Sequence, residues 1–322
     1  MSADPSMLIL KDLSAEVPDT NAFHWNLEEL SDENNTNEVL MYGYNASDNS
    51  AFFDRCERFK RKVYFNNWSP CEFAQMRTDE HDAFRKEERF DEVYSICPYS
   101  NKWLNELGLN REYKNVFYPF HSALIPTRQE KHFDVIYHGG AHGQEHIDCL
   151  KTLLNFNYRY CTMTHHINAL TARCLPYATN ANLTFTDKIN LIAKCKISVC
   201  YNIVHIAAEH IPAIKSYDNW EQNEAFSEVG GWNVMPQFKT RMHEAAFSRT
   251  LNLVMRDTWN IAEQYYEPET EFIYFDDAQD LERKINDIVN NWRDYGDMIE
   301  RAYMKSLQYT TENFIKKIKE KK

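Results

Sequence analysis

The sequence predicts an α/β protein that is built on parallel sheets. Short apolar runs typical of buried strands alternate along the chain with stretches of helical periodicity. Several runs are followed by a turn and a plausible helix, which is the order that parallel strands with crossover helices require. The runs with the strand pattern span 38–45, 61–68, 91–98, 133–140, 158–164, 195–202, 251–257 and 271–277.

The length of the chain, 322 residues, predicts two domains rather than one core. Pro119 and Pro126 forbid a continuous helix in the stretch before the strand at 133, so this stretch reads as a connector. We therefore expect a smaller N-terminal domain over 1–125 and a second domain over 126–300. Amphipathic helices follow, and the helix at 301–322 could pack back on the N-terminal domain.

Composition limits the classes of partner. The formal net charge of −12 argues against nucleic acid, because a duplex binder needs a basic face that neutralises phosphates. The eight cysteines include no CxxC pair and follow no signal-peptide pattern, so we expect reduced thiols and a cytoplasmic protein. No apolar run approaches the roughly 18 residues of a spanning helix, so no membrane span is expected.

A glycine-rich turn is the first candidate site. In "FDVIYHGGAHGQEH" (133–146), the backbone amides of Gly139 and Gly140 suit a phosphate, and His138 and His142 flank the turn. The spacing is not GxGxxG, and the next strand, "YRYCTMT", ends without an acidic residue for a dinucleotide ribose. NAD and FAD are therefore not expected, and a tight turn chosen for packing is the alternative.

The segment "KTRMHEAAFSRTLNLV" (239–254) is the second candidate. Glu244 lies in the first turn of a predicted helix and leads into a buried strand, with Lys239 and Arg241 just upstream. A carboxylate at this place can simply cap the helix. It can also accept ribose hydroxyls of a nucleotide, whose diphosphate Lys239 and Arg241 would then meet through charge-assisted hydrogen bonds.

Three ordered segments resemble the GT-B glycosyltransferases, most closely the group called CgeB-like or glycosyl transferases group 1. They are "FTDKINLIAKCKISVCYN" (185–202), "FKTRMHEAAFSRTLNLVMRD" (238–257) and "YYEPETEFIYFDDAQDLERKI" (265–285). They are similar to that group's helix and strand ending in Asn, its Arg-x-x-Glu-Ala-Ala element and its Phe-x-Pro-Gly-x-Glu loop. The order and spacing agree over roughly the C-terminal half of the chain.

The resemblance implies a GT-B-like fold, with two Rossmann-like domains facing across a cleft and C-terminal helices. The second domain would hold a nucleotide-sugar donor. By position, Glu244 would bind the ribose, and Arg241 with Lys239 would neutralise the diphosphate. The turn with His138, Gly139 and Gly140 would approach the phosphates, Tyr201 and Asn202 would line the nucleotide pocket, and Glu271 would be the loop glutamate.

Two positions depart from the group's pattern. Retaining relatives often carry a glutamate eight positions before the ribose-binding one, where this chain has Pro236. Ser248 and Arg249 replace the group's small Cys-Gly pair after the Glu-Ala-Ala turn. Inversion and retention of configuration therefore both stay open.

The catalytic base is not fixed by any motif. Glu72, His121 and His142 are candidates because they lie in loops or at the connector, and each can also be a cap or a surface residue. We expect no metal site: the carboxylates of "FDDAQD" precede a helix, where Asp277 or Asp280 is more simply the N-cap. The histidines of "HIAAEH" (205–210) do not share one helical face.

The sequence therefore predicts a metal-independent glycosyltransferase (EC 2.4 class) that moves a sugar from a nucleotide-sugar donor to the hydroxyl of a glycan or another acceptor. Lys239 and Arg241 would stabilise the leaving diphosphate, a UDP or GDP donor would be the substrate, and no further cofactor is expected. One alternative is an inactive GT-B-like protein that binds a glycan or a partner chain. Another is a transferase that modifies a nucleobase in DNA, against which the net charge weighs.

Overall fold

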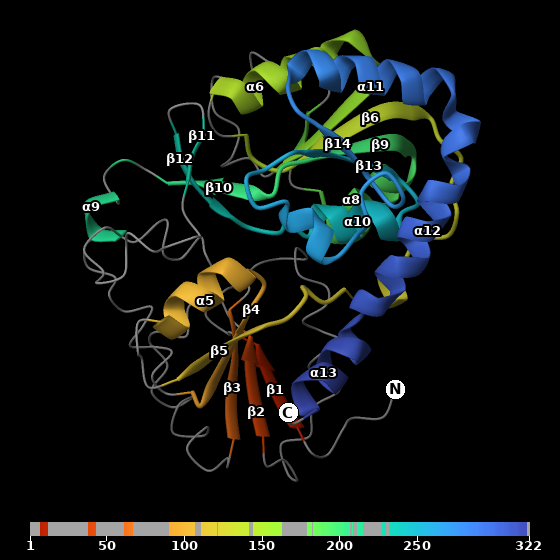
Figure 1. Ribbon diagram of the computed structural model, residues 1–322. Coiled ribbons are helices and arrows are strands. Elements are labelled where there is room, and N and C mark those ends of the chain that lie inside the picture. The colour runs from red at the N-terminus through yellow and green to blue at the C-terminus, as the bar shows by residue number, and fades with distance from the viewer. Residues whose placement is uncertain are drawn as a thin grey trace. The chain divides into compact units, whose positions relative to one another are not determined.

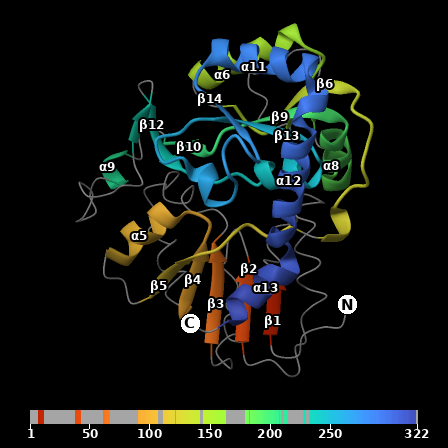
Figure 2. The same ribbon diagram turned by 45° about the vertical axis from the view of Figure 1, so that its right-hand side comes forward.

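The computed structural model describes most of the second half of the chain and parts of the first (Figures 1 and 2). The described residues are 7–11, 38–42, 61–66, 90–106, 111–120, 122–141, 144–162, 179–181, 183–206, 208, 211–214, 227–229 and 232–320. Within these ranges the structure is mixed α/β with parallel sheets, as the sequence predicts. None of the helices in these ranges is both long and apolar enough to cross a membrane.

The chain divides into two compact units. The first comprises Met1–Pro119, Val204–Gln237 and Phe314–Lys322, and the second comprises Phe120–Ile203 and Phe238–Asn313. The sequence predicts a seam at 125–126 and a continuous second domain. The compact second unit instead begins at Phe120 and leaves Val204–Gln237 to the first unit. Most of the small sheet of β10 (Ile203–His205), β11 (Ser227–Val229) and β12 (Trp232–Pro236) lies in this insertion.

A six-stranded parallel sheet forms the centre of the second unit. Its order is β14-β13-β9-β6-β7-β8, and every neighbouring pair is parallel. This is the order of a doubly wound sheet, in which the chain first moves outward from β6 and then returns to the other side of it. The strands are β6 (Phe133–His138), β7 (Tyr158–Thr162), β8 (Thr179–Ala181), β9 (Cys195–Cys200), β13 (Leu251–Met255) and β14 (Ile273–Phe275).

Helices cover both faces of this sheet (Figure 1). On one face lie α6 (Gln144–Lys151) and α11 (Ala278–Asn290), and on the other lie α8 (Phe185–Ala193) and α10 (Arg241–Phe247). Helix α12 (Gly296–Ser306) contacts α10, and its Ile299 belongs to the core beneath α6 and α11. Figure 2 shows the same layers from another side. Short 3-10 turns, η2 (Thr152–Asn155), η6 (Ile261–Gln264), η7 (Trp292–Tyr295) and η8 (Leu307–Tyr309), connect these elements.

The alternation of side chains along β6 explains the two layers. Val135 and Tyr137 belong to the core beneath α6 and α11, and Ile136 belongs to the core beneath α8 and α10. Each of these side chains is fully buried. A central strand that is apolar on both faces is typical of a parallel sheet covered by helices on both sides.

The first unit contains a five-stranded parallel sheet in the order β1-β2-β3-β4-β5. The strands are β1 (Met7–Lys11), β2 (Glu38–Tyr42), β3 (Arg61–Asn66), β4 (Glu92–Ser95) and β5 (Glu112–Asn115). Helix α5 (Pro98–Glu106) follows β4, and α9 (Ile211–Ile214) lies in the insertion. After the turn η1 (Ser122–Leu124), the chain enters the second unit's sheet.

Helix α13 (Thr311–Lys319) contains the last point at which the chain changes unit. Its Phe314 is fully buried in the first unit, where its ring lies 4.9 Å from that of Phe65 and 6.0 Å from that of Phe117. Aromatic pairs at such distances stabilise a core beyond the area that they bury. The C-terminal helix is therefore part of the N-terminal unit's core at this residue.

Candidate functional site

The strand order of the second unit's sheet distinguishes the edge at which a ligand would be expected to bind. The strand order reverses between β6 and β9, and ligands of open α/β sheets bind outside the carboxyl ends of the strands at such a switch point. Gly139 and Gly140 follow β6, and Tyr201 and Asn202 follow β9. The switch point thus brings together two segments that the sequence analysis assigned to the donor.

Arg241 lies directly over the glycine turn. Gly139 has a φ of +137°, which side-chain-bearing residues rarely adopt, and a Cβ built on it would lie 2.0 Å from the Arg241 guanidinium. The guanidinium donates to the Tyr137 hydroxyl over 3.3 Å, and that hydroxyl donates to the Gly140 carbonyl over 2.6 Å. The absence of a side chain at position 139 therefore makes room for the arginine at the switch point.

Asn202 fixes the segment that contains the second cation. Its side-chain oxygen accepts a 2.9 Å hydrogen bond from the backbone amide of Lys239, and its amide nitrogen lies 3.2 Å from the Met242 sulfur. Asn202 is only 1% exposed. It connects the end of β9 to the start of α10 and so places Lys239 beside Arg241 at the same edge of the sheet.

Glu244 belongs to a buried charged network. Its Oε1 accepts a 2.8 Å hydrogen bond from Lys188 Nζ, and its Oε2 lies 3.2 Å from His138 Nδ1, while His138 Nε2 lies 3.0 Å from the Ser198 hydroxyl. Burial by itself raises the pKa of the Glu244 carboxyl, but Lys188 and His138 outweigh it and lower the pKa. Burial lowers the pKa of His138. Glu244 is thus an anchored carboxylate in the structure.

The predicted donor residues fall into two groups by exposure. Gly139, Gly140, Lys239 and Arg241 are partly exposed. The second group is buried and consists of His138, Tyr201, Asn202 and Glu244. The Tyr201 ring, for example, packs 3.8 Å from the His146 ring and 5.7 Å from Phe275. Three candidates for the catalytic base, Glu72, His121 and His142, lie outside the described residues.

Solved structures share this architecture. Sucrose-phosphate synthase from Thermosynechococcus elongatus matches with a TM-score of 0.57 and 8% identity over 97% of each chain. HepE from Anabaena matches with a TM-score of 0.55 and 12% identity, over 97% of this chain and 98% of that one. TarM from S. aureus matches with a TM-score of 0.54 and 11% identity over 91% of this chain, which spans 57% of the TarM chain.

The fold is the GT-B fold. No protein-family model matches the chain, and the comparison with curated proteins finds no match. The GT-B architecture is therefore established through tertiary structure, at sequence identities that carry no residue-by-residue assignment.

Within the GT-B fold, two functional candidates escaped the sequence analysis. Lys188 lies in the first turn of α8, where Thr184 caps the helix by accepting from the Asp187 amide. Its partner Glu244 lies 56 residues further along the chain, and nothing in "FTDKINL" indicates this contact. Asp257 follows β13, and its position directly after a predicted buried strand is a signal that could have identified it. Only the tertiary structure connects Lys188 with Glu244.

Asp257 has a distinctive environment. Its Oδ1 accepts from the backbone amides of Trp259 and Ile261, at 2.9 and 3.2 Å, and its buried Oδ2 has no hydrogen-bond partner among the described residues. Burial raises the pKa of this carboxyl to about 6. Burial raises the pKa of the Cys200 thiol at the end of β9, while the positive charges of Arg241 and Lys239 lower it and the carboxylates of Glu244 and Asp257 raise it.

The carboxylates before α11 have structural roles in the GT-B fold. Asp277 is the N-cap of α11, since its Oδ1 accepts from the Asp280 amide over 2.8 Å, and Asp280 forms ion pairs with Lys284 and Arg283. The structure thus selects Asp277 from the two predicted caps. Across the described part of the chain, no three His, Cys, Asp or Glu side chains are grouped as a metal site. Glu271 accepts from the Glu267 amide over 2.8 Å within its own loop.

Proposed function

We propose that the protein is a glycosyltransferase that moves a sugar from a nucleotide-sugar donor to an acceptor hydroxyl. One observation carries this proposal: Arg241 lies over Gly139 at the switch point of a GT-B sheet, with Lys239 on the adjoining segment. Two positive charges beside a glycine turn suit a diphosphate, and they carry the proposal because the Gly139 amide itself donates to the Cys161 carbonyl over 2.9 Å. The structures that share the fold include HepE in complex with UDP and glucose and a TarM mutant in complex with UDP.

The chemistry of glycosyl transfer assigns a role to these charges. Cleavage of the bond between sugar and diphosphate leaves negative charge on the leaving group, which preorganised cations stabilise as it develops. Lys239 and Arg241 each supply one such charge, and a sheltered charge-assisted hydrogen bond contributes about 1.5–3 kcal/mol. Because these side chains can neutralise the diphosphate themselves, we propose a metal-independent transfer with UDP or GDP as the leaving group.

Glu244 serves this site as a positioning residue in our proposal. Its carboxylate holds Lys188 on α8 and faces His138 at the end of β6, so it fixes the strand end from which the glycine turn departs. The ribose contact predicted from the sequence requires Lys188 to move away from Oε1. With Glu244 3% exposed, the anchoring role is the one that its present contacts support.

We also propose that the chain is a relative of the CgeB-like group. The three segments that carry the resemblance form α8 with β9, α10 with β13, and β14 with the start of α11. The described cysteines, which are Cys97, Cys149, Cys161, Cys195 and Cys200, are free and buried, which fits a reducing compartment such as the cytoplasm.

A binding experiment with two variants tests the proposal. Calorimetric titration of the full chain with UDP and with GDP should detect one of them, and Arg241→Ala should weaken that binding about tenfold or more, since 1.4 kcal/mol corresponds to a factor of ten. The matched control is Arg283→Ala, which removes a guanidinium 68% exposed on α11. The proposal is wrong if neither nucleotide binds, or if both variants bind equally well.

An inactive binding protein is the second candidate, and one observation favours it. Pro236, which stands in place of the first glutamate of the retaining relatives, is the buried last residue of β12. An inactive protein would bind a glycan without any nucleotide, whereas the transferase must bind a nucleoside diphosphate. The same calorimeter, loaded with oligosaccharide alone and then with UDP, separates the two candidates.

A further inference from the structure

A cavity lies at the edge of the sheet opposite to the switch point. It measures about 510 Å³ and is lined by residues of the second unit only. Its lining includes Lys196 at the start of β9, whereas the switch point lies beyond the end of that strand. A strand of six residues spans about 20 Å, so this cavity is separate from the proposed donor site.

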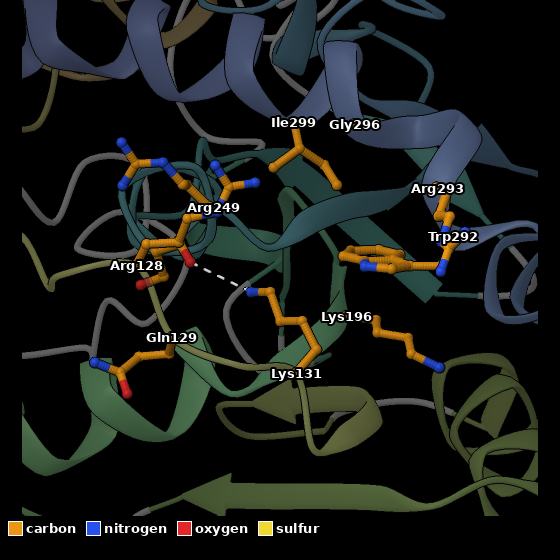
Figure 3. Close-up of a pocket in the computed structure, with 10 residues that line it drawn as sticks. Arg128, Gln129, Lys131, Lys196, Arg249, Trp292, Arg293, Gly296 and Ile299 are labelled. Atoms are coloured by element: carbon orange, nitrogen blue, oxygen red, sulfur yellow. Dashed lines mark hydrogen bonds between the residues drawn. The ribbon is translucent and has the colours of Figure 1, made fainter.

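Positive charge dominates the lining. The cations are Arg128, Lys131, Lys196, Arg249 and Arg293. Figure 3 shows Lys131 and Lys196 near one another, with Arg128 and Arg249 on one side of them and the indole of Trp292 on the other. Two carboxylates oppose these charges among the described residues, because Glu300 pairs with Arg128 and Arg249, and Asp134 pairs with Lys196. The cavity therefore keeps an excess of positive charge.

Lys131 is the central group of this cavity. Its Nζ donates to the carbonyl oxygens of Ala193 and Ser248, at 2.8 and 3.4 Å, and to the Thr250 hydroxyl at 3.1 Å. No carboxylate in the described structure forms an ion pair with Lys131. This is unusual, because charged side chains are rarely buried without a partner of opposite charge. Burial, together with the neighbouring guanidiniums of Arg128 and Arg249, lowers the pKa of Lys131 to about 7.

Arg249 occupies a backbone conformation that favours glycine. Its φ is +51°, a left-handed conformation that costs a side-chain-bearing residue about 1–2 kcal/mol. Its guanidinium lies 3.5 Å from the centre of the Tyr303 ring, and Nε lies 3.2 Å from Glu300, which fixes the group at the cavity. The adjacent Ser248, a residue 4% exposed, lines the cavity, and its buried hydroxyl has no partner among the described residues.

We propose that this cavity binds a small phosphomonoester, such as a phosphorylated sugar, at a site distinct from the donor site. The excess cations and the Ser248 hydroxyl would hold the phosphate, because charge-assisted hydrogen bonds to Arg and Lys are the strong contacts that phosphate forms. Trp292 and Ile299 offer an apolar wall for the carbon skeleton of the ligand. The volume falls within the usual range for small-molecule pockets, about 300–1,000 Å³.

Pyridoxal 5′-phosphate is the probe that tests this site. Its aldehyde condenses with a neutral lysine amine and releases water to form an imine, and added borohydride reduces the imine to a stable secondary amine that peptide mass spectrometry locates. At limiting reagent, Lys131 should be labelled about tenfold more than Lys151, an exposed lysine on α6 paired with Asp148. Excess inorganic phosphate should protect Lys131.

Two controls separate a phosphate site from a merely reactive lysine. Pyridoxal, which lacks the phosphate, should lose the preference for Lys131. Arg249→Gly should also lose it while the protein still folds, because glycine adopts the positive φ at this position without strain. Equal labelling of Lys131 by both reagents, or labelling no greater than that of Lys151, would overturn the proposal.

A third variant makes this test independent of the proposed transferase activity. Arg241→Ala alters the switch point and should leave the labelling of Lys131 unchanged. If that variant abolishes the labelling, the reagent is captured through the donor site and the second site is wrong. No step of the experiment uses a nucleotide or a sugar donor. The labelling can therefore disprove the phosphate site without bearing on the proposed transferase activity, and a failure of the transferase proposal would leave the phosphate site untouched.

Discussion

Arg241 and Gly139 depend on each other. The arginine side chain occupies the space in which any side chain at position 139 would lie, and the glycine alone tolerates a φ of +137° without strain. The sequence predicts a phosphate-binding role for each of the two residues, from separate motifs. Their contact shows that they form one local structure at the carboxyl end of β6.

Gly139→Ala should destabilise the protein by about 1–3 kcal/mol, through backbone strain and the collision with Arg241. The cost should be smaller in an Arg241→Ala background, where only the strain is left, and urea unfolding of the four proteins measures this coupling. Gly296→Ala is the control, because a Cβ there would meet nothing within 4 Å. An identical cost in both backgrounds would show that Arg241 does not lie over the turn.

The raised pKa of Asp257 predicts that the stability of the protein depends on pH. Its folded-state pKa of about 6 exceeds the ordinary value of 3.8, so the folded protein holds this proton more tightly than the unfolded chain. The stability contributed by Asp257 is therefore complete below about pH 4 and is lost as the pH rises through about 6. Asparagine keeps the side-chain oxygen that accepts from Trp259 and Ile261 but does not titrate.

Relative to the unmodified protein, Asp257→Asn should accordingly gain about 1–2 kcal/mol of stability between pH 4.5 and pH 7.5. Chemical unfolding at several pH values measures the gain. Asp294→Asn, on an exposed residue of η7, serves as the control for the loss of one carboxylate. A stability difference for Asp257→Asn that does not change with pH would mean that its carboxyl is not buried as described.

At the scale of elements, burial decided which strands the sequence could predict. All eight predicted runs contain a strand, including β6, β9 and β13, whose residues are mostly apolar. The sequence reading missed β1, "MLILK", despite its apolar pattern, whereas two other missed strands have weaker patterns. β5 is "EYKN", with one buried residue, and β8 is a three-residue edge strand. Such short strands are recognised by their neighbours in the sheet rather than by their own periodicity.

Helix α11 offers a test of a predicted cap. Asp277 lies in extended conformation before the helix, and its carboxylate accepts from the Asp280 amide. Asp277→Ala should cost about 1 kcal/mol of unfolding free energy, as for other N-cap deletions. The neighbouring Asp276→Ala, which removes only an exposed ion pair with Arg256, should cost clearly less in the same thermal unfolding assay. Equal costs would assign the cap to another residue.

At the scale of the whole molecule, the chain crosses between its two units more often than a linear reading suggests. The connector at 119–120, the insertion Val204–Gln237 and the segment from Phe314 onward each change unit. A periodic pattern identifies elements but contains no information on which sheet a short strand joins. The composition of the insertion therefore could not reveal that it belongs with the N-terminal unit.

Binding of a nucleotide should be visible in the stability of the full chain. A ligand at 100 times its dissociation constant adds about 2.7 kcal/mol to the folded state, which corresponds to a rise of several degrees in Tm for a chain of this size. We expect UDP or GDP to produce this rise and ADP and dTDP to produce less. A screen in which all four leave Tm unchanged would contradict a nucleotide-sugar donor.

The sequence by itself determined the α/β class, the central strands, the glycine turn and the basic segment at 239–241, because each follows from local periodicity, backbone preference or charge. Only the tertiary structure decided that Arg241 lies over Gly139, that Glu244 is held by Lys188 and His138, and that Lys131 stands among arginines at the other edge of the sheet. These contacts join residues far apart in the chain, and they depend on the order of the strands, which no local pattern specifies.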